Sequence, residues 1–393
     1  MNHTWLMVTL LGLAVGLAQG QPLIVSFGHN GELTCTNLTH TSRYVVERAP
    51  APSGPWTNLW GASANTWGTS NGTMQVIVPM TNSPSFFRVV VPTDDYLVVD
   101  LSGGTSASSY PVSYLADIPA GGWTDEYKTT KLVLRRIPAG TFTMGSTAEL
   151  GGSTNESPKH AVTLTEDFFA GVFEVTQKQW ELVMGTWPSY FTNIVDRETR
   201  PVEQVSYEDI RGASAGAGWP SNGNVDASSF MGQLRSKAGI AFDLPTEAEW
   251  EYAGRAGTTT TLNSGHGLIS PNSDPHMDQV ARYEHNGGGG FGQSPSVDSS
   301  AGSAKVGSYM VNRWGLYDTH GNVFELCLDW IAAYPTNAVT DPVGGTDVTY
   351  RVARGGGWWL SAGACRMAGV RITSNPDYAG HAQGFRVTAR GVE

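Results

Sequence analysis

The stretch NRWGLYDTHGNVFELCLDW, at residues 312–330, decides the fold of this chain. It combines a glycine turn, two spaced carboxylates and several aromatic side chains within a few turns of backbone. Further segments of similar character are LPTEAEWEYAGRAG at 244–257, RGGGWW at 354–359, CRMAGVR at 365–371 and GFRV at 384–387. Glycine, tryptophan and arginine recur together in these segments, which predicts a domain built from loops around aromatic side chains.

The composition supports this reading. The chain has 393 residues, enough for two domains, and 40% of them are hydrophobic, as in an ordinary globular protein. Only 15% are charged, whereas 48 Gly and 13 Trp are unusually many, which favours a loop-rich protein over a helical bundle. The formal net charge of −11 argues against nucleic acid as a partner, because a phosphate-binding surface needs a basic stripe.

Residues 1–20 are predicted to be a secretory signal peptide. The apolar run from Leu6 to Ala18 is too short to span a bilayer, and small residues at Ala18 and Gly20 suit a signal peptidase. The absence of Lys or Arg before Leu6 is the feature against export, and a buried N-terminal strand or helix is the alternative. No other segment reaches membrane length, so we expect a secreted or periplasmic protein without a membrane span.

The rest of the chain divides into three parts. Residues 21–92 contain short β-rich runs separated by turn formers, which predicts a small all-β sandwich module. Within it, VERAPAPSGPW at 46–56 resembles fibronectin-type repeats. Residues 93–130 are rich in Ser, Gly and Thr and are expected to form a linker. Residues 131–393 are expected to form the large domain.

Two helices are marked by their caps. Thr176 with Gln179, and Thr246 with Glu249, have the spacing of a capping box, and Gly185 and Gly257 are the expected stops. These helices place Trp180, Trp250 and Ala253 on inward faces, so we interpret these three side chains as core.

The large domain resembles the formylglycine-generating enzyme (sulfatase-modifying factor) family. The likeness rests on the segments quoted above, in the family's order, and on IPAGTFTMGS at 137–146. It implies an α+β, loop-rich mixed fold distantly like C-type lectins. The family's activity, implied by the same resemblance, is a copper- and oxygen-dependent oxidation of a cysteine in a sulfatase Cys-x-Pro-x-Arg segment to formylglycine.

A metal site is predicted at Asp318, Gly321, Val323 and Glu325. A hard cation such as calcium binds carboxylate and backbone carbonyl oxygens, and a glycine turn between two acids lets both kinds reach one ion. The spacing alone also fits a turn with two solvated acids. The resemblance favours structural calcium, because the family holds calcium through the positions that these four residues occupy. The family's other calcium site is not carried over, since Arg282 stands at its usual Asn.

Cys365 is the candidate catalytic residue. The family holds copper with two cysteines five apart, and thiolates suit Cu(I). By the resemblance, Leu360 stands at the first of these cysteines, Gly357 at a serine and Phe324 at an aromatic that is usually Trp. One thiolate cannot make that site, so copper is expected only if the protein is catalytic.

Other cysteines, histidines and arginines have mainly structural interpretations. Cys327 and Cys365 are predicted to form a disulfide that leaves Cys35 odd, with three buried thiols as the alternative. No two of the nine histidines have a metal-binding spacing on one helix face, so most are expected at the surface. By the resemblance, the arginines at motif positions either form internal ion pairs or line the peptide groove, and pairing with Glu325, Asp329 or Glu251 is favoured; they are Arg354, Arg366, Arg371 and Arg386.

Two functions therefore remain for the sequence. The favoured one is an exported binding or altered-processing protein, with an incomplete copper site and a protein, peptide or surface glycan as partner. The alternative is a formylglycine-generating oxidase acting on a sulfatase cysteine. Function on a shared fold has to be argued from the site, and the site lacks one cysteine.

Overall fold

The computed structural model describes the strands between residues 23 and 90, and residues 95–146, 152, 154–192, 195–287, 301–346, 349–369 and 371–392. The predicted signal peptide lies outside the described residues. The chain splits into two compact units: residues 1–95 with 115–117, and residues 96–114 with 118–393.

Between residues 23 and 90, the described parts of the first unit are all strands. One sheet has the order β1-β2-β6, and in the other β3 pairs with β4, β5 and β7; every pairing is antiparallel. The strands are β1 (Leu23–Phe27), β2 (Glu32–Thr36), β3 (Arg43–Ala49), β4 (Thr57–Asn58), β5 (Asn65–Trp67), β6 (Met74–Ile77) and β7 (Phe86–Val90). This agrees with β-rich sequence in the region, whereas a fibronectin-type sandwich stays a prediction.

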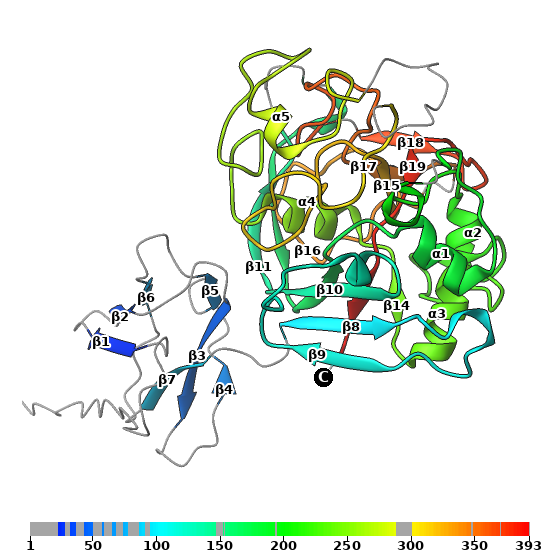
Figure 1. Ribbon diagram of the computed structural model, residues 1–393. Coiled ribbons are helices and arrows are strands. Elements are labelled where there is room, and N and C mark those ends of the chain that lie inside the picture. The colour runs from blue at the N-terminus through cyan, green and yellow to red at the C-terminus, as the bar shows by residue number, and fades with distance from the viewer. Residues whose placement is uncertain are drawn as a thin grey trace, which may run out of the picture. The chain divides into compact units, whose positions relative to one another are not determined.

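The second unit is built on a six-stranded sheet with the order β14-β20-β13-β10-β8-β9, and β8, β9 and β10 lie side by side in Figure 1. Its strands are β8 (Tyr96–Asp100), β9 (Val112–Leu115), β10 (Lys131–Ile137), β13 (Phe168–Gly171), β14 (Phe242–Asp243) and β20 (Thr388–Arg390). Strand β8 belongs to the segment expected as a linker. Its residues 96–99 are buried and pair with β10, so this part of the segment is a core strand and not a linker. The Ser- and Gly-rich sequence that follows it is the reason for the different expectation.

Helices α1 (Gln177–Met184), α2 (Tyr207–Arg211) and α3 (Phe230–Ala238) pack together, with Trp180 of α1 stacked on Phe230 of α3 at 5.2 Å between ring centroids. The predicted capping box of Thr176 and Gln179 is present, and Gly185 ends the helix in the left-handed conformation. Trp180 is buried, as expected for a core residue.

Helix α4 (Glu247–Arg255) packs against β11, β15 and β17. Its capping box of Thr246 and Glu249 is present, but the left-handed cap falls on Ala256, one residue before the expected Gly257. Trp250 and Ala253 are buried as predicted. The remaining helix is α5 (Met277–Val280), and the short 3-10 turns lie at 104–106, 125–128, 154–156, 197–199 and 216–218.

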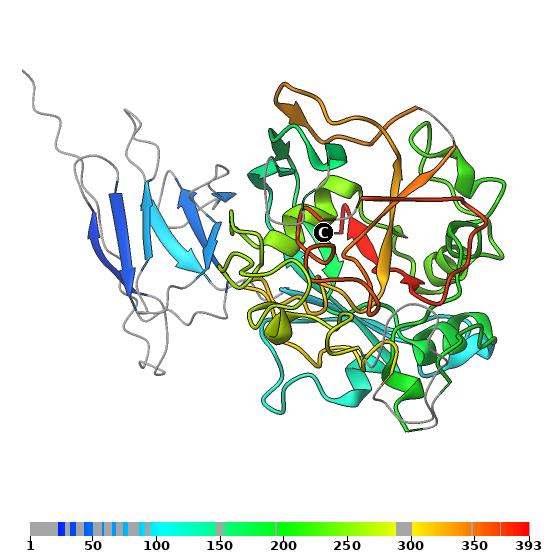
Figure 2. The same ribbon diagram turned by 90° about the horizontal axis from the view of Figure 1, so that it is seen from above.

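Two smaller sheets complete the unit. Their orders are β18-β17-β15-β19 and β11-β12-β16. The strands are β11 (Gly140–Met144), β12 (His160–Leu164), β15 (Phe324–Trp330), β16 (Val339–Thr340), β17 (Arg351–Arg354), β18 (Ile372–Ser374) and β19 (Gln383–Gly384). Figure 2 shows the long loops, coloured yellow to orange, that join these elements. The fold is thus mixed and loop-rich, as expected. Within the described ranges, no helix is both long and apolar enough to cross a bilayer.

Candidate functional site

Strand β15 and the glycine turn that precedes it form the frame of the site. Every residue of β15 is buried, and Glu325 lies opposite Arg354 of β17 in an antiparallel register. Gly321 has φ +68°, and a Cβ there would lie 2.0 Å from the carbonyl oxygen of Arg282. Only glycine fits this turn, so the backbone reaches β15 in one defined path.

Cys365 is a fully buried thiol. It belongs to an apolar cluster with Leu262, Met277 and Tyr283, and Leu360 packs against the same cluster. Its Sγ lies 3.7 Å from the carbonyl oxygen of Gly357 and 4.0 Å from that of Leu360. The structure therefore brings together the residues that the sequence compared with the copper site.

The chemistry of Cys365 is that of a thiol. Burial raises its pKa to about 12, so about one molecule in 10⁵ carries a thiolate at neutral pH. A Cβ on Gly356 would lie 2.6 Å from Sγ, which shows how closely the loop covers the sulfur. In the structure as it stands, Cys365 is a poor nucleophile and a poor metal ligand.

The predicted bridge between Cys327 and Cys365 is wrong. Both are free, buried thiols. Cys327 packs with Trp250, Val352 and Met367, in a different apolar cluster from that of Cys365. The alternation along β15 directs its side chain into that cluster, so the two sulfurs share a domain but not a contact. Burial also raises the pKa of Cys327 above its usual range.

An aromatic cluster adjoins Gly357. A Cβ on Gly357 would lie 3.6 Å from the ring of Phe324. The neighbouring Trp358 meets Phe191 edge-on at 5.3 Å and His381 at 5.9 Å between ring centroids. Tyr190, which is 40% exposed, lies 5.6 Å from His381. Sequence reasoning missed this cluster because no local pattern links its members.

Glu203 holds the 190–191 segment in place. Its carboxylate accepts the N–H groups of Tyr190 at 3.0 Å and Phe191 at 2.9 Å. Burial raises the pKa of this carboxyl to about 7, against the effect of those hydrogen bonds. The segment beside the aromatic cluster thus depends on a carboxyl that titrates near neutral pH.

His320 is a buried structural tie, unlike the surface or turn histidines expected to be in the majority. Its Nδ1–H donates to the carbonyl oxygen of Cys365 at 2.7 Å, and its Nε2 accepts the N–H of Asn263 at 3.1 Å. Burial lowers its pKa to about 4. The ring is therefore neutral and fixes the backbone at Cys365.

Among the four residues predicted to bind calcium, the carboxylates of Asp318 and Glu325 differ in their hydrogen-bond partners. Asp318 Oδ2 accepts the N–H of Gly307 at 2.6 Å, and its buried Oδ1 has no hydrogen-bond partner among the described residues. Both oxygens of Glu325 are used, since Arg386 binds them at 2.7 and 2.9 Å and Trp250 Nε1 donates at 2.8 Å. Asp318 thus has an oxygen to offer a cation, whereas Glu325 would first have to leave an ion pair.

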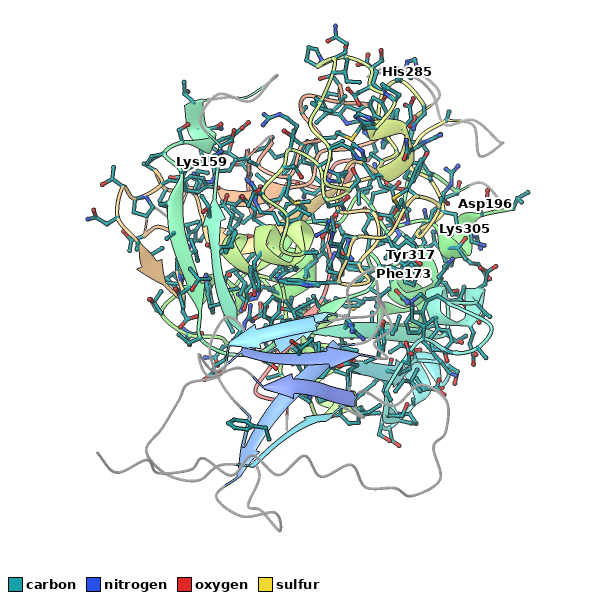
Figure 3. The ribbon with its side chains drawn as sticks, turned by 90° about the vertical axis from the view of Figure 1, so that its left-hand side faces the viewer. Lys159, Phe173, Asp196, His285, Lys305 and Tyr317 are labelled. Carbon is teal, nitrogen blue, oxygen red and sulfur yellow. The ribbon has the colours of Figure 1, made fainter. Side chains whose placement is uncertain are left out.

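Sequence reasoning missed Glu174 in this region. It is fully buried, accepts Asn322 Nδ2 at 2.6 Å and the N–H of Val323 at 3.2 Å, and its pKa is raised by burial and by the charges of Asp318 and Glu325. Figure 3 labels the preceding rings, Phe173 and Tyr317, which stack at 5.0 Å and so bring the two following acids together.

Burial raises the pKa of Asp318 to about 6, and the charge of Glu325 adds to this while Arg386 opposes it. Across the described residues, no three His, Cys, Asp or Glu side chains are grouped to hold a metal. The predicted set needs only two carboxylates with two backbone carbonyls, so calcium stays a prediction.

The motif arginines are internal ties. Arg354 pairs with Glu251 at 2.6 Å and Arg386 with Glu325 at 2.7 Å, as predicted. Arg366 pairs with Glu156 at 2.7 Å, and Arg371 with Glu247 at 2.6 Å, two partners that were not foreseen. All four guanidinium groups are buried, so they hold loops together rather than wait for a substrate.

Comparison with known proteins agrees with this geometry. Residues 123–390 match the family described as sulfatase-modifying factor enzyme 1-like domain. The chain is 32% identical to the chaperone protein LppX of Paenibacillus barcinonensis, over 53% of this chain and 74% of that protein. It is 30% identical to the formylglycine-generating enzyme of Streptomyces coelicolor, over 50% of this chain and 54% of that enzyme, so it spans about half the enzyme's length.

Among solved structures, Treponema denticola variable protein 1 is similar, with a TM-score of 0.50 and 28% identity over 66% of this chain and 95% of that chain. These matches, above all the family match over residues 123–390, assign the chain to a family. The chain belongs to the sulfatase-modifying factor enzyme 1-like domain family.

Proposed function

We propose that this chain is an exported binding or altered-processing protein that uses the sulfatase-modifying factor scaffold without its copper pair. The observation that carries the proposal is the environment of Cys365. The leucine at the position of the partner cysteine contributes an apolar side chain to the cluster around the sulfur. The other described thiol, Cys327, packs in a separate cluster.

The physical argument is the cost of making a ligand from Cys365. Copper(I) is bound by thiolates, and two in near-linear arrangement are the minimum for tight binding. Ionising a thiol with a pKa of about 12 at pH 7 costs on the order of 7 kcal/mol before any bond forms. Without a second thiol among the described residues of this cluster, binding has to repay all of that cost.

A protein partner is the favoured ligand class. The relative from Paenibacillus is named a chaperone, and the relative from Streptomyces is named a formylglycine-generating enzyme. The reaction of that family modifies a cysteine of a protein. The aromatic cluster of Tyr190, Trp358 and His381 beside Gly357 supplies a partly exposed surface for such a partner. A surface glycan is the second partner class. Secretion or a periplasmic location follows from the predicted signal peptide.

We also propose structural calcium at Asp318, Gly321, Val323 and Glu325. The buried, unpartnered Oδ1 of Asp318 and its raised pKa fit a bound cation, which would supply positive charge to this acidic region. The present pairing of Glu325 with Arg386 means that its carboxylate would either stay outside the ligand set or exchange partners on binding.

Copper binding and turnover test the proposal. Wild-type protein should bind no stoichiometric Cu(I) in competition with a chromogenic chelator, and should leave a Cys-x-Pro-x-Arg peptide unchanged by mass spectrometry. Leu360→Cys should gain Cu(I) binding, whereas Leu360→Ser, a control that shortens the side chain equally without a thiol, should not. Conversion of the peptide by the wild type would establish the alternative, a formylglycine-generating oxidase with a different ligand set.

A further inference from the structure

A second cavity lies away from Cys365, between α4 and the β11-β12-β16 sheet. It has a volume of about 460 Å³, within the usual range of small-ligand sites. Its walls include Met144, His160, Asp329, Tyr334 and Val339. His160 begins β12 directly after Lys159, which Figure 3 labels at the end of that strand.

The guanidinium of Arg371 and the hydroxyl of Tyr334 in this cavity already donate hydrogen bonds within the chain. Arg371 donates from Nε at 2.6 Å and from Nη2 at 2.7 Å to the carboxylate of Glu247, and from Nη1 to the carbonyl oxygen of Ala332. The hydroxyl of Tyr334 donates to the same carboxylate at 2.8 Å. Each donor nitrogen of Arg371 and the hydroxyl of Tyr334 therefore already donates to a residue of the chain.

Two acceptors, in contrast, are available. Asp329 Oδ2 accepts the N–H of Glu247 at 2.8 Å, and no described residue donates to Oδ1. His160 Nδ1 lies 3.1 Å from the carbonyl oxygen of Pro158 and must carry the proton in that bond, which leaves Nε2 as an acceptor without a partner in the described part of the chain. Both residues are more than nine-tenths buried and line the cavity.

Acidic residues outnumber basic residues in the lining of this cavity. Glu247, Asp329 and Asp341 contribute carboxyl groups, whereas Arg371 contributes the guanidinium. Burial, followed by the charge of Glu247, raises the pKa of Asp329 to about 8. This is the behaviour of a carboxyl that lacks a counter-cation. The ring of Tyr334 and the side chains of Met144 and Val339 provide apolar walls.

We propose that this cavity binds a primary ammonium group carried on an apolar stem, either a free aliphatic amine or a lysine side chain. Asp329 Oδ1 and His160 Nε2 accept hydrogen bonds from the ammonium group, and the apolar walls contact the stem. An anionic ligand meets the carboxyl groups of Glu247, Asp329 and Asp341 in the lining. The proposal does not depend on the function of the Cys365 site.

Calorimetry on the full chain tests this inference with n-pentylamine, its uncharged analogue n-pentanol, and N-acetyl-lysine methylamide. We expect n-pentylamine to bind and n-pentanol to bind at least about tenfold more weakly, because it lacks the charge-assisted contact with Asp329. Tighter binding of the lysine derivative than of the free amine identifies a protein ligand, and the reverse order identifies a small molecule. The proposal is overturned if n-pentylamine and n-pentanol bind equally well. It is also overturned if no probe binds at about 10 mM, tenfold above the dissociation constant of about 1 mM expected of a weak site.

Variants locate the contact. Asp329→Asn keeps an acceptor for the N–H of Glu247 and should weaken amine binding about tenfold or more. Asp341→Asn is the matched control, since the oxygens of Asp341 are held by Thr165 at 2.9 and 2.6 Å, and it should leave the affinity within about twofold. Equal affinity of Asp329→Asn and wild type, with unchanged melting temperatures, refutes the site.

Proton release gives a readout that a merely structural role would not move. The titratable groups that interact with Asp329 are Glu247, Glu249, Arg371, Arg351, Arg390 and Cys327. Because the Asp329 carboxyl is mostly protonated at pH 7 and must be ionised beside an ammonium group, binding should release protons to the buffer. The measured enthalpy should then change with the ionisation enthalpy of the buffer in wild type and not in Asp329→Asn. Buffer-independent enthalpy in wild type contradicts the proposed contact.

Discussion

Asp329→Asn should stabilise the protein increasingly as the pH rises. Burial and the charge of Glu247 raise the pKa of Asp329 from 3.8 to about 8, so the folded chain keeps a proton that the unfolded chain loses. The stabilisation that the protonated Asp329 carboxyl gives the folded wild type is fully present below pH 3.8, and it is lost as the pH rises to about 8. Each pH unit in this window removes about 1.4 kcal/mol, which sums to about 4 kcal/mol between pH 3.8 and pH 7.

The amide cannot ionise, and it still offers an oxygen to the N–H of Glu247. The free-energy difference between Asp329→Asn and wild type should therefore grow by about 1.4 kcal/mol per pH unit between pH 4.5 and 7.5. Urea unfolding followed by tryptophan fluorescence at several pH values measures this difference. Asp341→Asn, which replaces an exposed carboxyl of the same cavity lining, is the matched control for the substitution itself. Parallel stability curves for Asp329→Asn and wild type would refute the reasoning.

Three further predictions address the glycine turn, calcium and the thiols. Gly321→Ala should destabilise the protein by more than about 2 kcal/mol, because the new Cβ meets the Arg282 carbonyl oxygen at 2.0 Å; a loss within about 0.5 kcal/mol in urea unfolding would contradict this close approach. A calcium chelator should lower the melting temperature of wild type, and Asp318→Asn should reduce that effect because it removes a charged oxygen; identical melting with chelator and with excess calcium would count against the site. Cys327 and Cys365 should react with a thiol reagent only after unfolding, since both are buried, and a disulfide-linked peptide in a non-reducing digest would contradict the free thiols.

Short-range patterns in the sequence predicted several features correctly. Both capping boxes, at Thr176 and Thr246, are present because the participating residues lie three apart in the chain and meet in the first turn of any helix that they begin. The burial of Trp180 and Trp250 follows from the same periodicity. The family was evident from motifs that are each only a few residues long.

Local pattern failed where a residue's environment depends on distant segments. The apolar residues 96–99 of strand β8 are followed by Ser- and Gly-rich sequence, and that composition predicts a linker. Their pairing with β10 is what shows that they belong to the hydrophobic core. The bridge between Cys327 and Cys365 was inferred from a shared domain, but strand alternation and the glycine loop send the sulfurs into different clusters.

The sequence is sufficient to show which residue types occupy the segment around Cys365, with Leu360 five residues before it. How these side chains behave depends on the folded chain. Burial turns Cys365 into an inert thiol, and Glu247 beside Asp329 makes a carboxyl that holds its proton at neutral pH. The reason is that identity is a property of one position, whereas a pKa depends on the solvent and charges that folding brings from elsewhere in the chain.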